Sequence, residues 1–363
     1  MLQKALGVVF VVANIAGLLG CGSTANHYIY AALPAANQII AYREDPNSGV
    51  LTQVAGSPYS VGDGAHSLAL HPSGKFLYAA NLGQNENDIS LFTIAGNGVL
   101  TEVFPRTSVA PNASQPELLR MDPAGAFLYV ANAASSNISV FSIDSSSGAL
   151  SPVANSPFPI GVAPLNMQLT PSGNFLFVTI ASQSSGLIVG ISVNAGMLAQ
   201  ASVTPSDGIN PYGLAIDPSG TYLYAANSGS NTVSIFSIDS AGGLKEVPNS
   251  PLGVGSVPAA LILDPQGEFL YVANQGASSL AAYSINATTG LPDILTTSTT
   301  TGTFSTESSP NFLVADPSGK YLFVGNQGTS AGIQAFGVSS GTLTALSTYG
   351  VGNTPSSIVV LSK

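Results

Sequence analysis

The stretch Asp122-Pro-Ala-Gly-Ala-Phe-Leu-Tyr-Val-Ala-Asn132 joins a turn to a strand, and a close copy of it returns at residues 264–274. Similar aliphatic and aromatic cores recur seven times along the chain, at intervals of 47 to 52 residues. Their central residues are Tyr30, Tyr78, Tyr129, Phe177, Tyr224, Tyr271 and Phe323. A constant period of roughly 40–50 residues made of short β segments is typical of propeller blades. The spacing therefore predicts an all-β, seven-bladed β-propeller.

Each repeat divides into four predicted strands, A to D. Six repeats contain an X-Pro-X-Gly turn that follows an apolar strand A and precedes strand B. The first residues of these turns are His71, Asp122, Thr170, Asp217, Asp264 and Asp316. Proline second and glycine fourth are typical of a type I β-turn. Alternating apolar and polar residues, as in 138–143, predict strand C, and a glycine-containing turn leads to a short strand D.

The two ends of the chain predict how the ring closes. The first repeat begins directly with a strand B at Tyr28–Ala32, whereas Ser356–Leu361 reads as a strand A with no strand B after it. Pairing the C-terminal strand with the first one would complete a blade and remove two exposed sheet edges. We therefore expect one propeller domain of four-stranded antiparallel blades over residues 26–363.

The two copies Phe127–Asn132 and Phe269–Asn274, each preceded by Asp-Pro-X-Gly, carry a family resemblance. They resemble the repeats of seven-bladed lactonase-type propellers, a group that includes 6-phosphogluconolactonase-like proteins, carboxymuconate cyclases and YVTN-repeat surface proteins. The resemblance covers nearly all of the predicted domain. It implies the fold strongly and the activity weakly, because the shared residues belong to turns and to the core.

The N-terminus predicts export and lipidation. Lys4 precedes an apolar stretch that ends in Leu18-Leu19-Gly20-Cys21, which resembles a bacterial lipobox, and Cys21 is the chain's one cysteine. We expect a lipoprotein signal peptide over residues 1–20 and a lipidated linker over residues 21–25. The protein would then be anchored to a membrane of the cell envelope through its N-terminal lipid. An ordinary cleaved signal that happens to contain a cysteine is the alternative.

Charge limits the possible partners. The chain has 8 Lys and Arg residues against 18 Asp and Glu residues, a formal net charge of −10. So few cations on an acidic chain cannot neutralise a run of phosphates, which argues against nucleic-acid binding. No motif indicates a cofactor or a metal site, and we expect neither.

The candidate site lies where each strand A begins, at the mouth of the central channel. The residues five positions before each turn are His66, Glu117, Leu165, Tyr212, Ala259 and Asn311, with Ser356 as the seventh by analogy. His66 is the candidate general base, with Glu117 orienting its imidazole. Arg106 and Arg120 are candidates to hold a carboxylate or to stabilise an oxyanion. In lactonase-like relatives a Pro-His pair commonly stands where His66 does, although here Ala65 precedes the histidine.

These residues leave two functions open. The favoured interpretation is an envelope protein that binds an unknown protein, glycan or small polar ligand at the channel mouth. The alternative is a hydrolase, similar to 6-phosphogluconolactonases, that acts on an extracytoplasmic sugar lactone with His66 as base. The alternative interpretation of the site is that it has no function: His66 and Glu117 are solvated groups at the channel mouth, and Arg120 pairs with a nearby residue.

Overall fold

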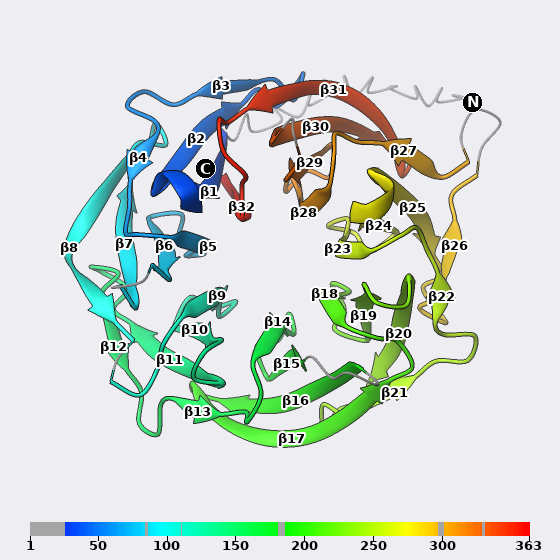
Figure 1. Ribbon diagram of the computed structural model, residues 1–363, viewed down its shortest axis with the longest axis horizontal. Helices are drawn as coiled ribbons and strands as arrows, with labels where there is room; N and C mark the ends of the chain where they lie inside the picture. Colours follow the sequence, from blue (N-terminus) through cyan, green and yellow to red (C-terminus); the bar gives the residue numbers. More distant parts are fainter. Residues whose placement is uncertain (1–25, 84–85, 110, 181–185, 297–300, 329–330) are drawn as a thin grey trace, which may run out of the picture.

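Seven β-sheets stand around a central axis like the blades of a propeller (Figure 1). This computed structural model describes residues 26–83, 86–109, 111–180, 186–296, 301–328 and 331–363. The predicted signal peptide (residues 1–20), linker (residues 21–25) and lipidation site Cys21 lie outside the described residues. No helix within the described ranges is long and apolar enough to cross a membrane.

Each blade has the predicted order of strands from the channel outward, with antiparallel neighbours. The innermost A strands are β32 (Ser357–Ser362), β5 (Ala65–Leu70), β9 (Pro116–Met121), β14 (Pro164–Leu169), β18 (Pro211–Ile216), β23 (Pro258–Leu263) and β28 (Pro310–Ala315). The B strands are β1 (His27–Leu33), β6 (Phe76–Asn81), β10 (Phe127–Asn132), β15 (Phe175–Ile180), β19 (Tyr222–Asn227), β24 (Phe269–Asn274) and β29 (Tyr321–Asn326).

The outer half of each blade varies more than the inner half. The C strands are β2 (Gln38–Glu44), β7 (Asp88–Ile94), β11 (Asn137–Ile143), β16 (Gly186–Asn194), β20 (Thr232–Ile238), β25 (Ser279–Ile285) and β30 (Gly332–Ser339). The D strands are β3 (Leu51–Gln53), β8 (Leu100–Ser108), β12 (Leu150–Pro152), β17 (Met197–Ser206), β21 (Leu244–Glu246), β26 (Pro292–Ile294) and β31 (Thr342–Gly350). Four short strands also pair with a C strand: β4 (Tyr59–Ser60), β13 (Phe158–Pro159), β22 (Leu252–Gly253) and β27 (Thr303–Ser305). Two single-turn 3-10 helices, η1 (Pro34–Ala36) and η2 (Gln275–Ala277), complete the described elements.

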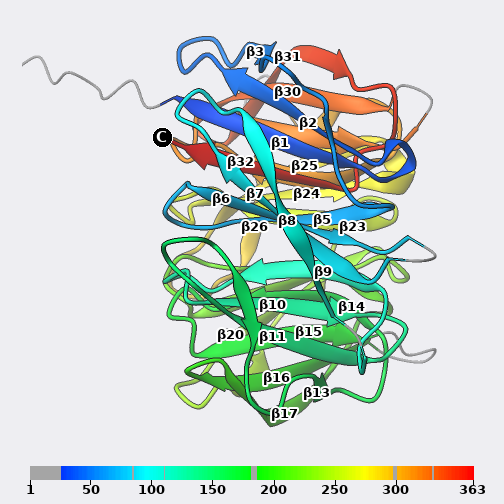
Figure 2. The same cartoon turned by 90° about the vertical axis from the view of Figure 1, so that its left-hand side faces the viewer.

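The ring closes as the termini predict. Strand β32 pairs with β1 in antiparallel register, with Tyr30 opposite Val359, and so supplies the A strand of the first blade. Next to the paired residues, the Asn26 amide donates to the Lys363 carbonyl at 2.7 Å, and the Lys363 amide donates to the Asn26 carbonyl at 2.9 Å. Figure 2 shows β32 beside β1. The prediction of ring closure is confirmed.

The turns between A and B strands also form as predicted. In all six, the amide of the fourth-position glycine donates to the carbonyl of the first residue at 2.8 to 3.0 Å. The central residues of the seven B-strand cores are at most 1% exposed. They lie between blades: the Tyr30 hydroxyl, for example, donates to the Gly98 carbonyl of the next blade at 3.0 Å. Burial of these large side chains holds neighbouring blades together, since each blade packs only on its neighbours.

Candidate functional site

In six of the seven blades, a β-bulge marks the position where the A strand meets the channel mouth. In the pairing of β9 with β10, Pro116 lies opposite Asn132 and Leu118 lies opposite Ala131, so Glu117 is the extra residue. The same shift occurs in five other blades. The extra residues are His66, Glu117, Leu165, Tyr212, Ala259 and Asn311. Because a bulge re-aims a side chain, this explains why the predicted rim positions face the channel.

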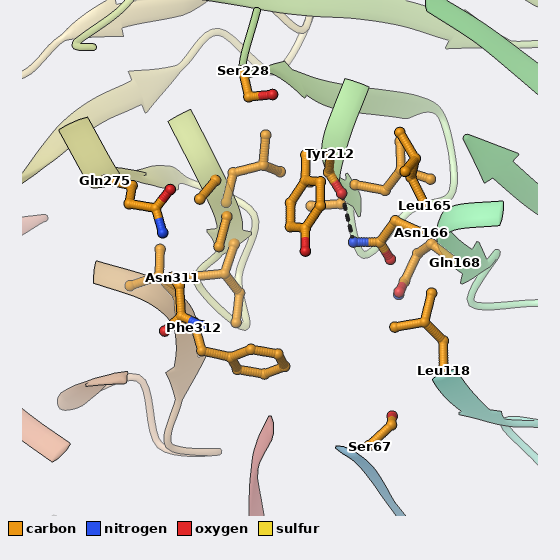
Figure 3. A pocket seen from close by; sticks show the side chains of 18 of the residues that line it. Ser67, Leu118, Leu165, Asn166, Gln168, Tyr212, Ser228, Gln275, Asn311 and Phe312 are labelled. Atoms are coloured by element: carbon orange, nitrogen blue, oxygen red, sulfur yellow. Dashed lines mark hydrogen bonds between the residues drawn. The ribbon is translucent and has the colours of Figure 1, made fainter. Parts of the chain in front are cut away.

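These rim residues, together with Ser356, line one cavity of about 700 Å³. That volume is typical of a small-molecule site. The cavity extends along the A strands as far as Pro218 and Asp264, in the turns at their far ends. Figure 3 shows Asn166 and Gln168 on one wall, Gln275 and Asn311 on the opposite wall, and the Tyr212 ring between them.

The His66 imidazole has one defined hydrogen bond, between its Nδ1 and the backbone carbonyl of Glu117 in the next blade, at 3.2 Å. A carbonyl oxygen can only accept, so Nδ1 carries the proton and Nε2 keeps a lone pair. No described residue forms a hydrogen bond with Nε2. The Ser356 hydroxyl donates to the His66 carbonyl at 2.7 Å and fixes the backbone on the other side. The hydrogen bond to the Glu117 carbonyl therefore favours the tautomer with the proton on Nδ1, which leaves Nε2 able to accept a proton as a general base does.

Glu117 orients the histidine through its backbone and not through its carboxylate, which differs from the expectation. The Glu117 side chain lines the cavity next to Tyr212. Burial, and secondarily the charge of Glu117, raise the pKa of the Tyr212 phenol. Because its pKa is raised, the phenol stays neutral at neutral pH, and Tyr212 lines the cavity, where it can form hydrogen bonds.

Arg120 lies half-buried in the channel wall, three residues along β9 from Glu117. Its Nε donates to Gln168 Oε1 at 3.1 Å, and its two terminal nitrogens donate to the Leu119 carbonyl at 2.9 Å and to Asn166 Oδ1 at 3.0 Å. All three acceptors are neutral, and Arg120 forms no ion pair with any described residue. Burial lowers its pKa to about 10, which still leaves it cationic at neutral pH. A guanidinium has five N–H groups, so two remain without a hydrogen-bond partner among the described residues.

Arg106 does not line the cavity, which differs from the expectation that it helps to hold a carboxylate or an oxyanion there. It lies on β8, the outermost strand of its blade (Figure 1). Its Nε donates to Glu102 at 2.8 Å and a terminal nitrogen donates to Glu86 at 3.1 Å. Its guanidinium also stands 5.6 Å from the centre of the Phe104 ring. The structure thus brings together His66, Glu117 and Arg120 but leaves Arg106 apart.

The sequence analysis missed Asn166 and Gln168, the two amides that hold Arg120. Asn166 also donates to the Tyr212 carbonyl at 2.9 Å (Figure 3). Gln168 occupies the position in β14 that Arg120 occupies in β9, three residues after the bulge. In four other blades this position holds Ala69, Ala215, Ile262 and Val314. Superimposing the repeats would therefore have shown two neighbouring blades with polar residues where the rest are apolar.

Metal-ligating side chains gather at one place in the part of the chain that the structure describes. His27, Glu44 and Asp316 offer ligand atoms within 4.8 Å of one another. None of the three lines the channel cavity. Asp316 stands at the end of β28, opposite to the end where the rim residue Asn311 stands.

Comparisons with known proteins agree with this fold. The chain matches a protein of Formosa agariphila named 6-phosphogluconolactonase with 40% identity over 91 residues, about a quarter of the length of each chain. Among solved structures, a periplasmic gluconolactonase of Pseudomonas aeruginosa superimposes with a TM-score of 0.76 at 19% identity, covering 93% of this chain and 99% of that one. A proposed 6-phosphogluconolactonase of Bacteroides fragilis gives a TM-score of 0.78 at 21% identity, with 93% and 98% covered. At such identities these two structures establish the fold alone.

The family model described as Lactonase, 7-bladed beta-propeller matches residues 23–165, 162–257 and 245–360. These segments span nearly the whole described ring and include every channel residue discussed above. The chain therefore belongs to the seven-bladed β-propeller lactonase family.

Proposed function

We propose that the protein hydrolyses a lactone in the channel cavity, with His66 as general base and Arg120 as the group that stabilises the oxyanion. The observation that carries this proposal is the tautomer of His66. Its hydrogen bond to the Glu117 carbonyl leaves a lone pair on Nε2, and His66 lines the same cavity as Arg120. Family membership and the named relatives support hydrolysis over the binding role that the sequence alone favours. Binding without turnover becomes an outcome of the test.

The proposed reaction needs one water molecule and no other reactant. His66 Nε2 takes a proton from water while the water oxygen bonds to the lactone carbonyl carbon. The two free N–H groups of Arg120 donate to the oxyanion that forms, a contribution typically worth about 10²–10³-fold in rate. The tetrahedral intermediate then collapses by breaking the ring C–O bond. The proton on Nε2 passes to the departing alkoxide oxygen, and the product is a hydroxy acid.

The charge of the cavity favours an uncharged sugar lactone over a phosphorylated one. Arg120 is the one Lys or Arg residue among the described residues that line it, and the Glu117 carboxylate lines it too. A phosphate carries up to two negative charges and is usually held by several donors or cations. Asn166, Gln168, Gln275 and Asn311 instead provide amides suited to hydroxyl groups.

The test is the hydrolysis of glucono-δ-lactone by the purified protein, measured against buffer and against 6-phosphogluconolactone. We expect turnover above buffer for the neutral lactone, and a loss of about 10²–10⁴-fold in His66→Gln, the range typical of a general base. His71→Asp is the matched control, because Asp occupies this turn position in four other blades. It should keep full activity. Tight lactone binding with no turnover would instead indicate the binding role.

We also propose that the lipidated Cys21 anchors the protein in the cell envelope, on the basis of the Leu18–Cys21 motif and the apolar stretch before it. Two or more acyl chains anchor a protein stably, whereas one does so marginally. Metabolic labelling with a radioactive fatty acid should mark the wild-type protein and leave Cys21→Ser unlabelled. Equal labelling of both would exclude this anchor.

A further inference from the structure

A buried cluster of three ionisable side chains lies at the seam where the ring closes. His27 begins β1 and Glu44 ends β2, and the two are direct partners across these strands of the first blade. Asp316 comes from the last blade, in the turn between β28 and β29. The side chains of His27, Glu44 and Asp316 are at most 8% exposed. The cluster therefore joins the first and last blades, away from the channel mouth.

The hydrogen bonding of this cluster is incomplete. His27 Nδ1 and both carboxylate oxygens of Glu44 are buried and have no hydrogen-bond partner. Asp316, in contrast, accepts from the Ser318 amide at 3.0 Å and from the Tyr321 amide at 2.7 Å within its own turn. A buried carboxylate without a donor is costly unless a cation compensates it.

The distances fit a shared ion better than direct bonding. His27 Nδ1 is 3.4 Å from Glu44 Oε2 and 3.6 Å from Asp316 Oδ2. Both separations exceed the usual hydrogen-bond range of about 2.7–3.2 Å. Two ligands bound at about 2.0–2.2 Å around a tetrahedral ion lie roughly 3.4 Å apart, which is the spacing seen here.

We propose that His27, Glu44 and Asp316 bind a Zn²⁺ ion that joins the first blade to the last. An imidazole nitrogen favours zinc over calcium or magnesium, and the two carboxylates neutralise its double charge. Three protein ligands leave the fourth position to water. The inference does not depend on lactone hydrolysis, because the cluster lies outside the channel cavity.

The test uses the purified protein, stripped of metal with a chelator, incubated with Zn²⁺ and then desalted. Elemental analysis should find about one zinc per chain, and the thermal unfolding midpoint should rise with Zn²⁺ because the ion binds the folded state. Loss of the Glu44 carboxylate in Glu44→Gln should weaken binding by at least about a hundredfold, since even indirect partners of a metal contribute about 10–100-fold. His27→Gln should behave alike.

Glu102→Gln is the matched control, because Glu102 is also a glutamate with little exposure, and it pairs with Arg106 on the outer strand of a different blade. It should retain zinc. Equal zinc in wild type, Glu44→Gln and His27→Gln would overturn the proposal, as would stabilisation by Ca²⁺ with no retained zinc. Should the variants fail to fold, X-ray absorption at the zinc edge of the wild type decides. One imidazole with oxygen ligands supports the site, and a spectrum without imidazole overturns it.

Discussion

Arg106 and Arg120 are close in sequence, yet they differ in whether a carboxylate pairs with the guanidinium. Arg106 has two carboxylate partners on the outer edge of its blade, Glu102 and Glu86. Arg120 has only neutral acceptors in the channel wall. Although burial opposes it, the bond to Glu102 and the charges of both glutamates raise the pKa of Arg106. Burial alone lowers that of Arg120.

The difference shows that burial and the number of hydrogen bonds do not distinguish these two arginines. Both side chains are partly buried, and both form several hydrogen bonds. What distinguishes Arg120 is that nothing among its described partners neutralises it. A charge kept without a counter-ion is a cost to the fold, and such costs concentrate at sites that meet a ligand. The following substitutions test this contrast.

The largest effect is expected from Arg120→Met. This change removes the only Lys or Arg cation among the described cavity-lining residues and should lower kcat for lactone hydrolysis by about 10²–10³-fold. Because the lost charge has no counter-ion in the fold, the free energy of unfolding should stay within about 1 kcal/mol of wild type. Steady-state kinetics and urea denaturation measure the two quantities. A large loss of stability with unchanged kcat would assign Arg120 to the fold.

An intermediate effect is expected from Gln168→Leu. The substitution removes the acceptor of the Arg120 Nε bond while keeping the side chain's size. Arg120 would keep its other two bonds but lose part of its orientation, so kcat should fall by about tenfold with little change in KM. The conservative Gln168→Glu adds a carboxylate next to Arg120 and should pair with it. If activity survived that pairing, the free charge would not be needed.

A small effect is expected from Glu117→Gln. The histidine is held by the Glu117 backbone carbonyl, which this substitution leaves in place. Activity should therefore change by less than about threefold. Removing the Glu117 charge also removes one cause of the raised pKa of Tyr212, so that pKa should move down toward its ordinary value. A loss of activity as large as that of His66→Gln would mean that the carboxylate does orient the imidazole.

The rim of the site could be predicted because it depends on a local rule. Six of the rim residues stand at a fixed distance before an X-Pro-X-Gly turn, so counting along the sequence locates them without knowledge of the fold's details, and Ser356 follows by analogy. The position of Arg106 could not be found in this way. Arg106 lies instead on the outermost strand β8, which contains Pro105, and an outermost strand tolerates proline on its unpaired edge.

The seam cluster could not be predicted for a different reason. The pairing of His27 with Glu44 follows from one hairpin, but Asp316 joins them only once the C-terminal strand has closed the ring. The hydrogen bonds of Arg120 to Gln168 and Asn166 also join two blades. Contacts between blades depend on how the sheets stack, and no local motif encodes that stacking.

The smallest effect is expected from Arg106→Met, which completes the contrast with Arg120. The substitution removes two ion pairs on the outer strand, and partly exposed pairs are typically worth about 0–1 kcal/mol each. Stability should fall slightly, and less so at high salt, because salt screens such pairs. Since Arg106 lies outside the cavity, kcat and KM for the lactone should equal those of wild type. A drop in kcat comparable to that of Arg120→Met would show that the outer network controls the channel, and the distinction between the two arginines would fail.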